Sequence, residues 1–220
     1  MNRNKPFVYS VAFLSLTIPS QGRFIYGFVL VLEMLLLEII GTLINAAVSK
    51  LKFDEIRSYF VMSVMICVTI FFRQLLAILY PEIALTLGFI LYFPTVSSFI
   101  LYYMFSGIEL PLAKRLSENL KNTFKFSVAI LLFFLFRDIA GFGTFTFFGK
   151  NHRILEVVLL NPDRIGIFMF FASIPGAIIL VGTMIYLYIL FKNQVLYHIK
   201  KQNKNADKAE NKSEAGEAKK

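Results

Sequence analysis

The chain has 220 residues, of which 57% are hydrophobic and 17% are charged, whereas a soluble domain typically carries about 25% charged residues. The net charge of +9 does not indicate nucleic-acid binding, because lysine and arginine lie at the ends of apolar stretches and in the polar C-terminal region, where membrane topology requires them. The single cysteine, Cys67, excludes an internal disulfide, and its apolar surroundings predict a small buried side chain.

Six apolar stretches cover most of residues 7–192, and each predicts a membrane-spanning segment, because a crossing helix needs about 20 apolar residues. They lie near 7–19, 24–49, 59–80, 83–105, 124–147 and 165–191. The first stretch would reach only about 20 Å as a helix. It is therefore a half-length segment, or it completes its crossing as extended chain beyond Pro19. Residues 193–220 are rich in charge and have almost no apolar side chain after Ile199, which predicts a disordered cytoplasmic tail after an integral membrane domain at 1–192.

The basic residues predict the orientation of the chain in the membrane. Seventeen of the 23 lysines and arginines lie in the N-terminus, the two loops and the tail that share one side if there are six crossings. Four lie on the other side, and two lie within spans. Because loops rich in lysine and arginine stay in the cytoplasm, both termini are expected there. If the first segment only re-enters the membrane, its two charges change sides and the orientation of the rest is unchanged.

Spans one to three and four to six each begin with an element that proline disturbs, at Pro19 and at Pro94. With three crossings in each half, two equivalent halves would be inverted relative to each other. Such repeats place their site at the membrane midplane, beside discontinuous helices. We therefore predict an all-α polytopic membrane protein with six transmembrane segments, arranged as two inverted three-helix halves whose first helices are half-length or broken.

Charged residues inside the spans are candidates for an ion path or for buried pairing, because each costs about 2.5–3.5 kcal/mol at the membrane centre. They are Glu33, Glu38, Arg73, Arg137 and Asp138. Glu33 and Glu38 are about 140° apart around a helix, so they do not form a carboxylate dyad, and the adjacent Arg137 and Asp138 also diverge. Two interpretations stay open: a proton or Na⁺ path, or pairing between helices, for example of Glu38 with Arg137 or Arg73.

The segment Gly141-Phe142-Gly143-Thr144 follows the apolar part of span five and predicts a turn at the membrane surface. It is too short for a phosphate-binding loop and follows a helix instead of a strand. No nucleophile–base pair and no metal-ligand spacing occurs in the sequence, so we predict no catalytic residue and no metal site.

Several stretches, in order, resemble the six-span subunits of Rnf electron-transport complexes and of the Na⁺-translocating NADH:quinone reductase (the RnfA/RnfE and NqrD/NqrE type). The strongest is 136–145, Phe-Arg-Asp-Ile-Ala-Gly-Phe-Gly-Thr-Phe, which is similar to the family's Arg-Glu-Ile-x-Gly-x-Gly-Thr-x-Phe. The others are Glu55-Ile56-Arg57, Leu87-Gly88-Phe89-Ile90 and Ile174-Pro175-Gly176-Ala177. With both termini inside, the chain resembles the RnfE/NqrD member more than its inverted partner.

This resemblance implies two inverted halves with half-helices first. In the family, each half-helix carries one cysteine, and a pseudo-symmetric inverted partner subunit supplies two more. These four cysteines hold an iron–sulfur cluster, which passes electrons between flavin-bearing or soluble partners. Here the first position falls near Leu14 or Ser15 and the second near Ser98. Serine does not replace a thiolate at a soft iron–sulfur centre. We therefore expect this chain alone to bind no cofactor, with iron–sulfur and flavins in the wider complex.

The resemblance then predicts a non-catalytic subunit of an Rnf/Nqr-like ion-translocating complex in a bacterial cytoplasmic (inner) membrane. Its partners would be the other membrane subunits and the lipid bilayer, and its role would be that of a scaffold or an ion path. The alternatives are a small inverted-repeat transporter of ions or solutes, with the broken segments around the substrate, and a purely structural membrane partner.

Overall fold

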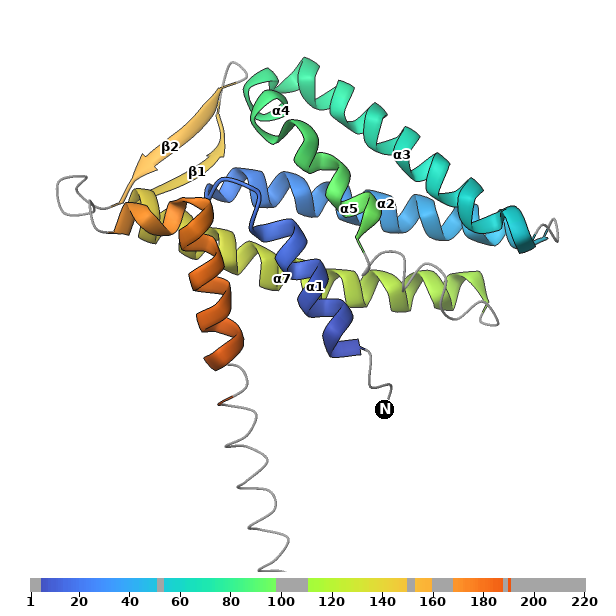
Figure 1. The fold of residues 1–220 in the computed structure, drawn as a ribbon. Coiled ribbons are helices and arrows are strands. Elements are labelled where there is room, and N and C mark those ends of the chain that lie inside the picture. The colour runs from blue at the N-terminus through green and yellow to red at the C-terminus, as the bar shows by residue number, and fades with distance from the viewer. Residues whose placement is uncertain are drawn as a thin grey trace, which may run out of the picture. The chain divides into compact units, whose positions relative to one another are not determined.

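The computed structural model describes residues 5–50, 54–97, 111–149, 153–159, 168–187 and 190. The chain forms two compact units, 1–178 and 179–220. The first unit is mainly helical and carries a small two-stranded sheet (Figure 1). In the second, residues 179–187 belong to an apolar helix, Ile174–Leu187, that begins in the first unit. The tail predicted at 193–220 lies outside the described residues.

The N-terminal stretch forms a short helix, α1 (Lys5–Thr17), followed by a break and then by the long helix α2 (Phe24–Lys50). Proline has no backbone N–H and disfavours helical geometry in the residue before it, so Pro19 ends α1 after 13 residues. The last bond of α1 runs from the Ile18 N–H to the Leu14 carbonyl at 3.2 Å. The half-length first helix predicted from the sequence is therefore present.

The fourth apolar stretch is broken as predicted, and more than once. After α3 (Asp54–Leu79), the chain forms α4 (Pro81–Leu87), the 3₁₀ turn η1 (Gly88–Tyr92) and α5 (Phe93–Val96). Gly88 adopts φ 44°, a conformation that suits glycine, and the backbone becomes extended at Ser97. Residues 98–110 lie outside the described ranges, and with them most of the second half of the predicted span 83–105.

The helix α7 (Leu112–Phe142) ends at Gly143, which adopts φ 64° and donates its N–H to the Ile139 carbonyl, the usual left-handed helix cap. This confirms the predicted turn, but the prediction of helix up to residue 147 was wrong. Residues Thr144–Phe148 form β1 and pair antiparallel with β2 (Ile154–Val158), with Thr146 opposite Glu156. The alternating threonine and phenylalanine of β1 favour a strand. The all-α prediction missed this hairpin.

The sixth apolar stretch is also discontinuous in the part that is described. It contains the 3₁₀ turn η3 (Phe168–Ala172) and then the helix Ile174–Leu187. The Ser173 N–H donates to the Phe170 carbonyl at 3.1 Å, which closes the turn before the helix begins. A single unbroken helix over the predicted span 165–191 is therefore absent, because the chain changes its helical geometry at Ser173.

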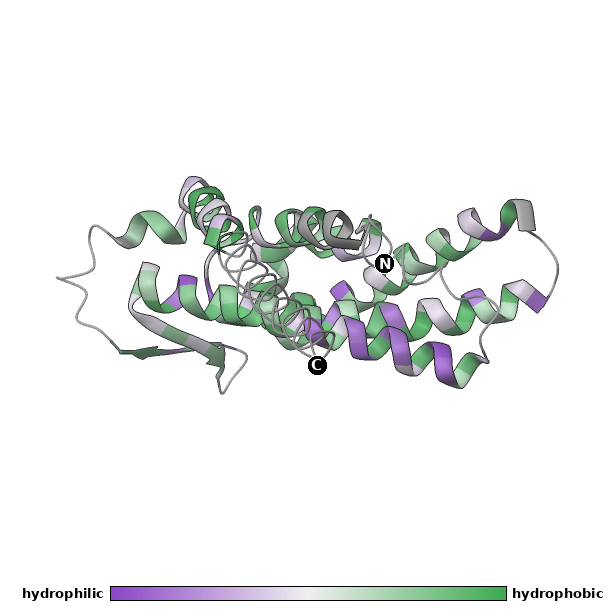
Figure 2. Ribbon diagram, turned by 90° about the horizontal axis from the view of Figure 1, so that it is seen from below, coloured by the Kyte–Doolittle hydropathy of each residue, from purple (hydrophilic) through white to green (hydrophobic). Residues whose placement is uncertain are grey.

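Among the described residues, two helices are long and apolar enough to cross a membrane: α2 and residues Ile56–Leu79 of α3. Large apolar side chains cover the outer surface of α3, including Tyr59, Phe71 and Ile78, each at least 70% exposed. A core helix of a soluble protein would bury such residues, whereas a lipid-facing helix exposes them. Figure 2 shows green along most of the ribbon, with purple concentrated on the N-terminal half of α7. The fold is compatible with an all-α membrane domain that carries one hairpin.

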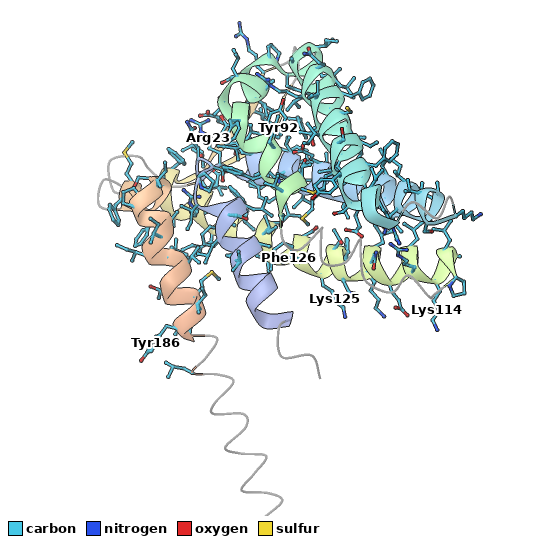
Figure 3. The ribbon with its side chains drawn as sticks, turned by 45° about the vertical axis from the view of Figure 1, so that its right-hand side comes forward. Arg23, Tyr92, Lys114, Lys125, Phe126 and Tyr186 are labelled. Carbon is cyan, nitrogen blue, oxygen red and sulfur yellow. The ribbon has the colours of Figure 1, made fainter. Side chains whose placement is uncertain are left out.

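The helix α2 packs against α3 and α5 through one face and against α7 through another. The contact with α7 is close at Gly27, where an added Cβ atom would lie 2.4 Å from the Phe134 ring. On the outer side of α7, Figure 3 shows Lys114 and Lys125 projecting away from the ribbon. Phe126 turns towards α1, where its ring centroid lies 6.3 Å from that of Phe13. The centre of the first unit is thus α2, enclosed by helices.

Candidate functional site

Arg137 lies in the interior near the end of α7, and its side chain is fully buried. Guanidinium carries five N–H donors, and all five are matched by backbone carbonyl oxygens. The acceptors are Thr17 at 2.9 Å, Ser20 at 3.1 Å, Phe171 at 3.2 Å, Ala172 at 2.9 Å and Ser173 at 3.4 Å. The arginine therefore joins the end of α1 to the end of η3, where helix carbonyls lack partners within the helix.

Asp138, the next residue, is equally buried, and its carboxylate bonds to groups other than those around Arg137. Its Oδ2 accepts hydrogen bonds from the Phe24 N–H at 3.1 Å, from the Thr146 N–H at 2.8 Å and from the Thr146 hydroxyl at 2.6 Å. Its Oδ1 accepts from the Thr144 hydroxyl at 3.1 Å. A carboxylate at the first turn of α2 is favourable because the free N–H groups and the helix dipole both attract negative charge.

Arg137 and Asp138 together form what we call the anchor, which joins α1, α2, η3 and β1 to α7. Their divergence was predicted from their adjacency and is confirmed. The predicted pairing of Glu38 with Arg137 or Arg73 was wrong. Arg137 is occupied by backbone carbonyls, and Arg73 is exposed on α3. The sequence could not show this, because carbonyl acceptors are present at every residue and leave no mark in composition.

Glu33 occupies the middle of α2 and is fully buried. Neither of its carboxyl oxygens has a hydrogen-bond partner. The Thr69 hydroxyl of α3 is the polar group that interacts with this carboxyl, but the geometry is looser than that of a normal hydrogen bond. The Thr69 hydroxyl in turn lies 2.6 Å from the Thr95 hydroxyl of α5, and either oxygen can be the donor. We call these three residues, from three different elements, the Glu33 cluster.

Glu38 faces another neighbour, as its 140° offset from Glu33 predicted. Its Oε1 accepts from the Thr42 hydroxyl at 3.3 Å, and that hydroxyl accepts from the Asn119 amide of α7 at 3.4 Å. Arg115, a buried residue of α7, attracts the Glu38 carboxylate. The sequence analysis did not single out Asn119 or Arg115, because both lie in the polar segment before span five.

The same network continues to the end of α2. Arg57 of α3 donates from Nε to the Asn45 side-chain oxygen at 2.6 Å and repels Arg115. Arg57, Arg115 and the C-terminal end of α2 therefore lie close together.

The two broken segments lie against each other. Apolar side chains of α1 and its break, together with Phe93 of α5, line an open groove of about 430 Å³. Its lining residues are Val11, Leu14, Ser15, Ile18, Pro19 and Phe93. Pro19 and Pro94, predicted as half-helix breaks, thus flank the region where α1 meets α5. The groove is almost entirely apolar apart from the serine.

The groove does not suit an iron–sulfur cluster in the part of the chain that the structure describes. The hydroxyl of Ser15 donates to the Ala12 carbonyl of its own helix at 2.9 Å, and Ser98 lies outside the described ranges. Cys67 is exposed on α3, so the prediction of a buried side chain was wrong, because this face of α3 is not covered by another helix. Within the described ranges, no three His, Cys, Asp or Glu side chains come together as metal ligands.

Thr69 and Thr95 are the residues of the Glu33 cluster that sequence reasoning missed. Threonine in an apolar helix usually bonds to a carbonyl of its own helix, as Thr17 does with Phe13 at 2.7 Å. Nothing in the sequence separates Thr69 and Thr95 from that common case. Only the packing of α3 against α5 brings the two hydroxyls together.

Comparison with protein-family models finds no match for this chain, and comparison with curated proteins finds no similar sequence. The function must therefore be inferred from the residues themselves.

Proposed function

We propose that this protein is a membrane subunit of an ion-translocating electron-transport complex of the Rnf/Nqr type, in which it serves as scaffold and ion path. The observation that carries the ion path is Glu33, a buried carboxyl without a hydrogen-bond partner beside the broken segment α4–α5. Acidic residues inside membrane segments are costly, and they mark ion pathways and proton relays in membrane proteins. Discontinuous helices in transport proteins accompany such sites.

The scaffold role is supported by the anchor. Residues 136–145, which resemble the family most strongly, contain Arg137, Asp138 and Thr144, and these are the residues that tie the half-length α1 to α2, η3 and β1. The proposed arrangement has six crossings in two inverted halves, with both termini in the cytoplasm of a bacterial cell. Its support is the pair of broken segments, which meet at the apolar groove.

In this function the chain itself does not transfer electrons. Ser15 is engaged with its own helix, and a hydroxyl does not offer the soft thiolate that an iron–sulfur centre requires. In the proposed complex, the cluster and the flavins belong to other subunits. This chain would close the membrane domain around them and provide part of the route for the ion.

Purification of the chain from its native membrane in a mild detergent tests this function. We expect flavin-containing subunits and an inverted membrane partner to co-purify, and we expect the chain alone to contain no iron or acid-labile sulfide. The variant Glu33→Gln should assemble normally but lose ion translocation, whereas Glu82→Gln, on the exposed surface of α4, should retain both. A chain that purifies alone, or that carries stoichiometric iron and sulfide by itself, contradicts the proposal.

The second candidate function is a small transporter of ions or solutes, and one observation favours it. The Glu33 cluster is built entirely from this chain, so it needs no partner subunit to form. Reconstitution of the purified chain into liposomes distinguishes the two functions. Uptake by the isolated chain that Glu33→Gln abolishes would support the transporter, and the absence of such uptake, with co-purification of flavin subunits, would support the complex.

A further inference from the structure

The carboxyl group of the Glu33 cluster is buried without a compensating charge or hydrogen bond. Glu33 has no exposed surface and neither carboxyl oxygen has a partner. No charged side chain among the described residues acts on it; only the hydroxyl of Thr69 does. A carboxylate in this position would be a bare charge in a low-dielectric interior, which is strongly unfavourable. The carboxyl therefore needs a cation, and the smallest one is a proton.

No positive charge on the elements packed against α2 balances Glu33 among the described residues. On α3, Arg73 is exposed, and on α4, Glu82 is exposed. On α7, Arg137 and Asp138 are bonded to other groups, and Arg115 acts on Glu38. α5 and β1 contain no charged residue. The described surroundings of Glu33 thus supply hydroxyls but no positive charge.

The two hydroxyls of the cluster form a path that leads away from the carboxyl. Thr69 and Thr95 are buried, and their oxygens lie 2.6 Å apart, so one donates to the other and the direction can reverse. A hydroxyl that can both accept and donate transmits a proton by accepting one and releasing its own. Thr95 lies in the last turn of α5, two residues before the backbone becomes extended at Ser97. The path therefore ends where the helix is broken.

We propose that Glu33 binds and releases a proton inside the membrane domain, and that Thr69 and Thr95 relay this proton between Glu33 and the end of α5. This deepens the proposed ion-path function and rests on it for its biological role. In the relay, the Glu33 carboxyl gives one proton to the Thr69 oxygen, and Thr69 gives its own proton to Thr95. Thr95 then gives one proton to a water molecule that enters at the break and becomes hydronium, so both hydroxyls are restored and Glu33 is left as a carboxylate.

The geometry favours a proton over a metal cation. A hard metal cation takes about six oxygen ligands, whereas the Glu33 cluster offers one carboxyl and two hydroxyls. Those hydroxyls already bond to each other. No group of three acidic, histidine or cysteine side chains accompanies them within the described ranges. A proton needs only one oxygen of Glu33 and a neighbour that accepts it.

Infrared difference spectroscopy of the purified, detergent-solubilised chain in H₂O and D₂O tests the relay. A protonated buried carboxyl has a distinct C=O band. We expect one such band to disappear in Glu33→Gln and to persist in Glu82→Gln. Glu38→Gln identifies any band from the second buried carboxyl of α2. In Thr69→Val and Thr95→Val the Glu33 band should remain, and its deuterium exchange should slow at least about tenfold.

Three results would overturn the proposal. The first is a spectrum in which Glu33→Gln removes no band. The second is loss of the band on addition of Na⁺ at constant pH, which would make the cluster a Na⁺ site. The third is deuterium exchange in both threonine variants at the rate of the parent chain. Because the measurement uses the chain alone, its failure is distinct from failure of the proposed complex, which the co-purification experiment tests.

Discussion

The anchor and the Glu33 cluster both bury ionisable side chains, but the hydrogen bonding of these side chains is opposite in the two places. In the anchor, Arg137 makes five hydrogen bonds and Asp138 accepts four. In the Glu33 cluster, both carboxyl oxygens are without a partner. A buried charge whose bonds are all formed stabilises an arrangement, because removing it leaves many groups unsatisfied. A buried ionisable group without hydrogen bonds destabilises the fold and is retained for another reason.

The comparison therefore separates architecture from function inside a single helical unit. The anchor fixes where α1, α2, η3 and β1 begin or end, through groups that are far apart in the sequence. The Glu33 cluster contributes nothing comparable to these connections. Substitution of Arg137 or Asp138 should lower the stability of the fold, whereas substitution of Glu33 should not.

The largest expected effect follows from Arg137→Met, which removes the donor of five hydrogen bonds to carbonyl oxygens, three of them buried. We expect the free energy of unfolding to fall by about 3–5 kcal/mol, measured by denaturant titration of the detergent-solubilised protein. Arg73→Met, at an exposed arginine of α3, is the matched control and should change stability by no more than about 0.5 kcal/mol. Equal stability of the two variants would show that the anchor does not hold the unit together.

Asp138→Asn should have the next largest effect, because it removes the charge and one acceptor oxygen while preserving the shape. Hydrogen bonds to charged groups contribute about 1.5–3 kcal/mol each, so a loss in that range is expected in the same titration. Glu156→Gln breaks the ion pair between the half-exposed Glu156 and Arg23 and should cost at most about 1 kcal/mol. If Glu156→Gln lowered the free energy of unfolding more than Asp138→Asn does, burial would not explain the contribution of Asp138.

Thr69→Val and Thr95→Val should each cost about 0.5–1.5 kcal/mol, the contribution of one neutral hydrogen bond. Because the two hydroxyls bond to each other, the double variant should cost less than the sum of the single ones. Thr86→Val, on α4, loses only a bond to its own helix and serves as the control. Strict additivity of the two cluster variants would mean that the hydroxyls do not interact in the membrane.

Glu33→Gln should have the smallest effect on stability and the opposite sign. Replacing an unpartnered buried carboxyl by a neutral side chain of the same size should leave the protein unchanged or more stable by up to about 1 kcal/mol. The denaturant titration checks this, with Glu82→Gln as the exposed control. If Glu33→Gln were as destabilising as Asp138→Asn, Glu33 would belong with the anchor, and the contrast between the two regions would disappear.

Much of the helical pattern could be predicted from individual residues. Pro19 predicted the end of α1, because proline removes a helix donor wherever it occurs. The fourth stretch is broken as predicted, but at Gly88 and Ser97 and not at Pro94, which lies in the first turn of α5. Gly143 predicted the turn after α7. The hairpin that follows was missed because 124–147 was interpreted as one span, although its last residues alternate threonine and phenylalanine.

The partners of the charged residues could not be predicted. Arg137 was recognised as a buried charge, but its acceptors lie up to 120 positions away and are backbone atoms common to all residues. Glu33 was recognised as a candidate for the ion path, yet nothing in the sequence associated it with Thr69 or Thr95. The exposure of Cys67 likewise depends on which face of α3 its neighbours leave uncovered.

The sequence by itself determined which stretches are apolar, where helices are interrupted and which charges lie within them, because chain hydrophobicity and backbone stereochemistry act locally. Only the tertiary structure decided that Arg137 is fully bonded while Glu33 has no partner. Hydrogen bonds require two groups within about 3.5 Å at a suitable angle. Whether residues distant in sequence come that close depends on how the helices pack, and packing depends on the whole chain at once.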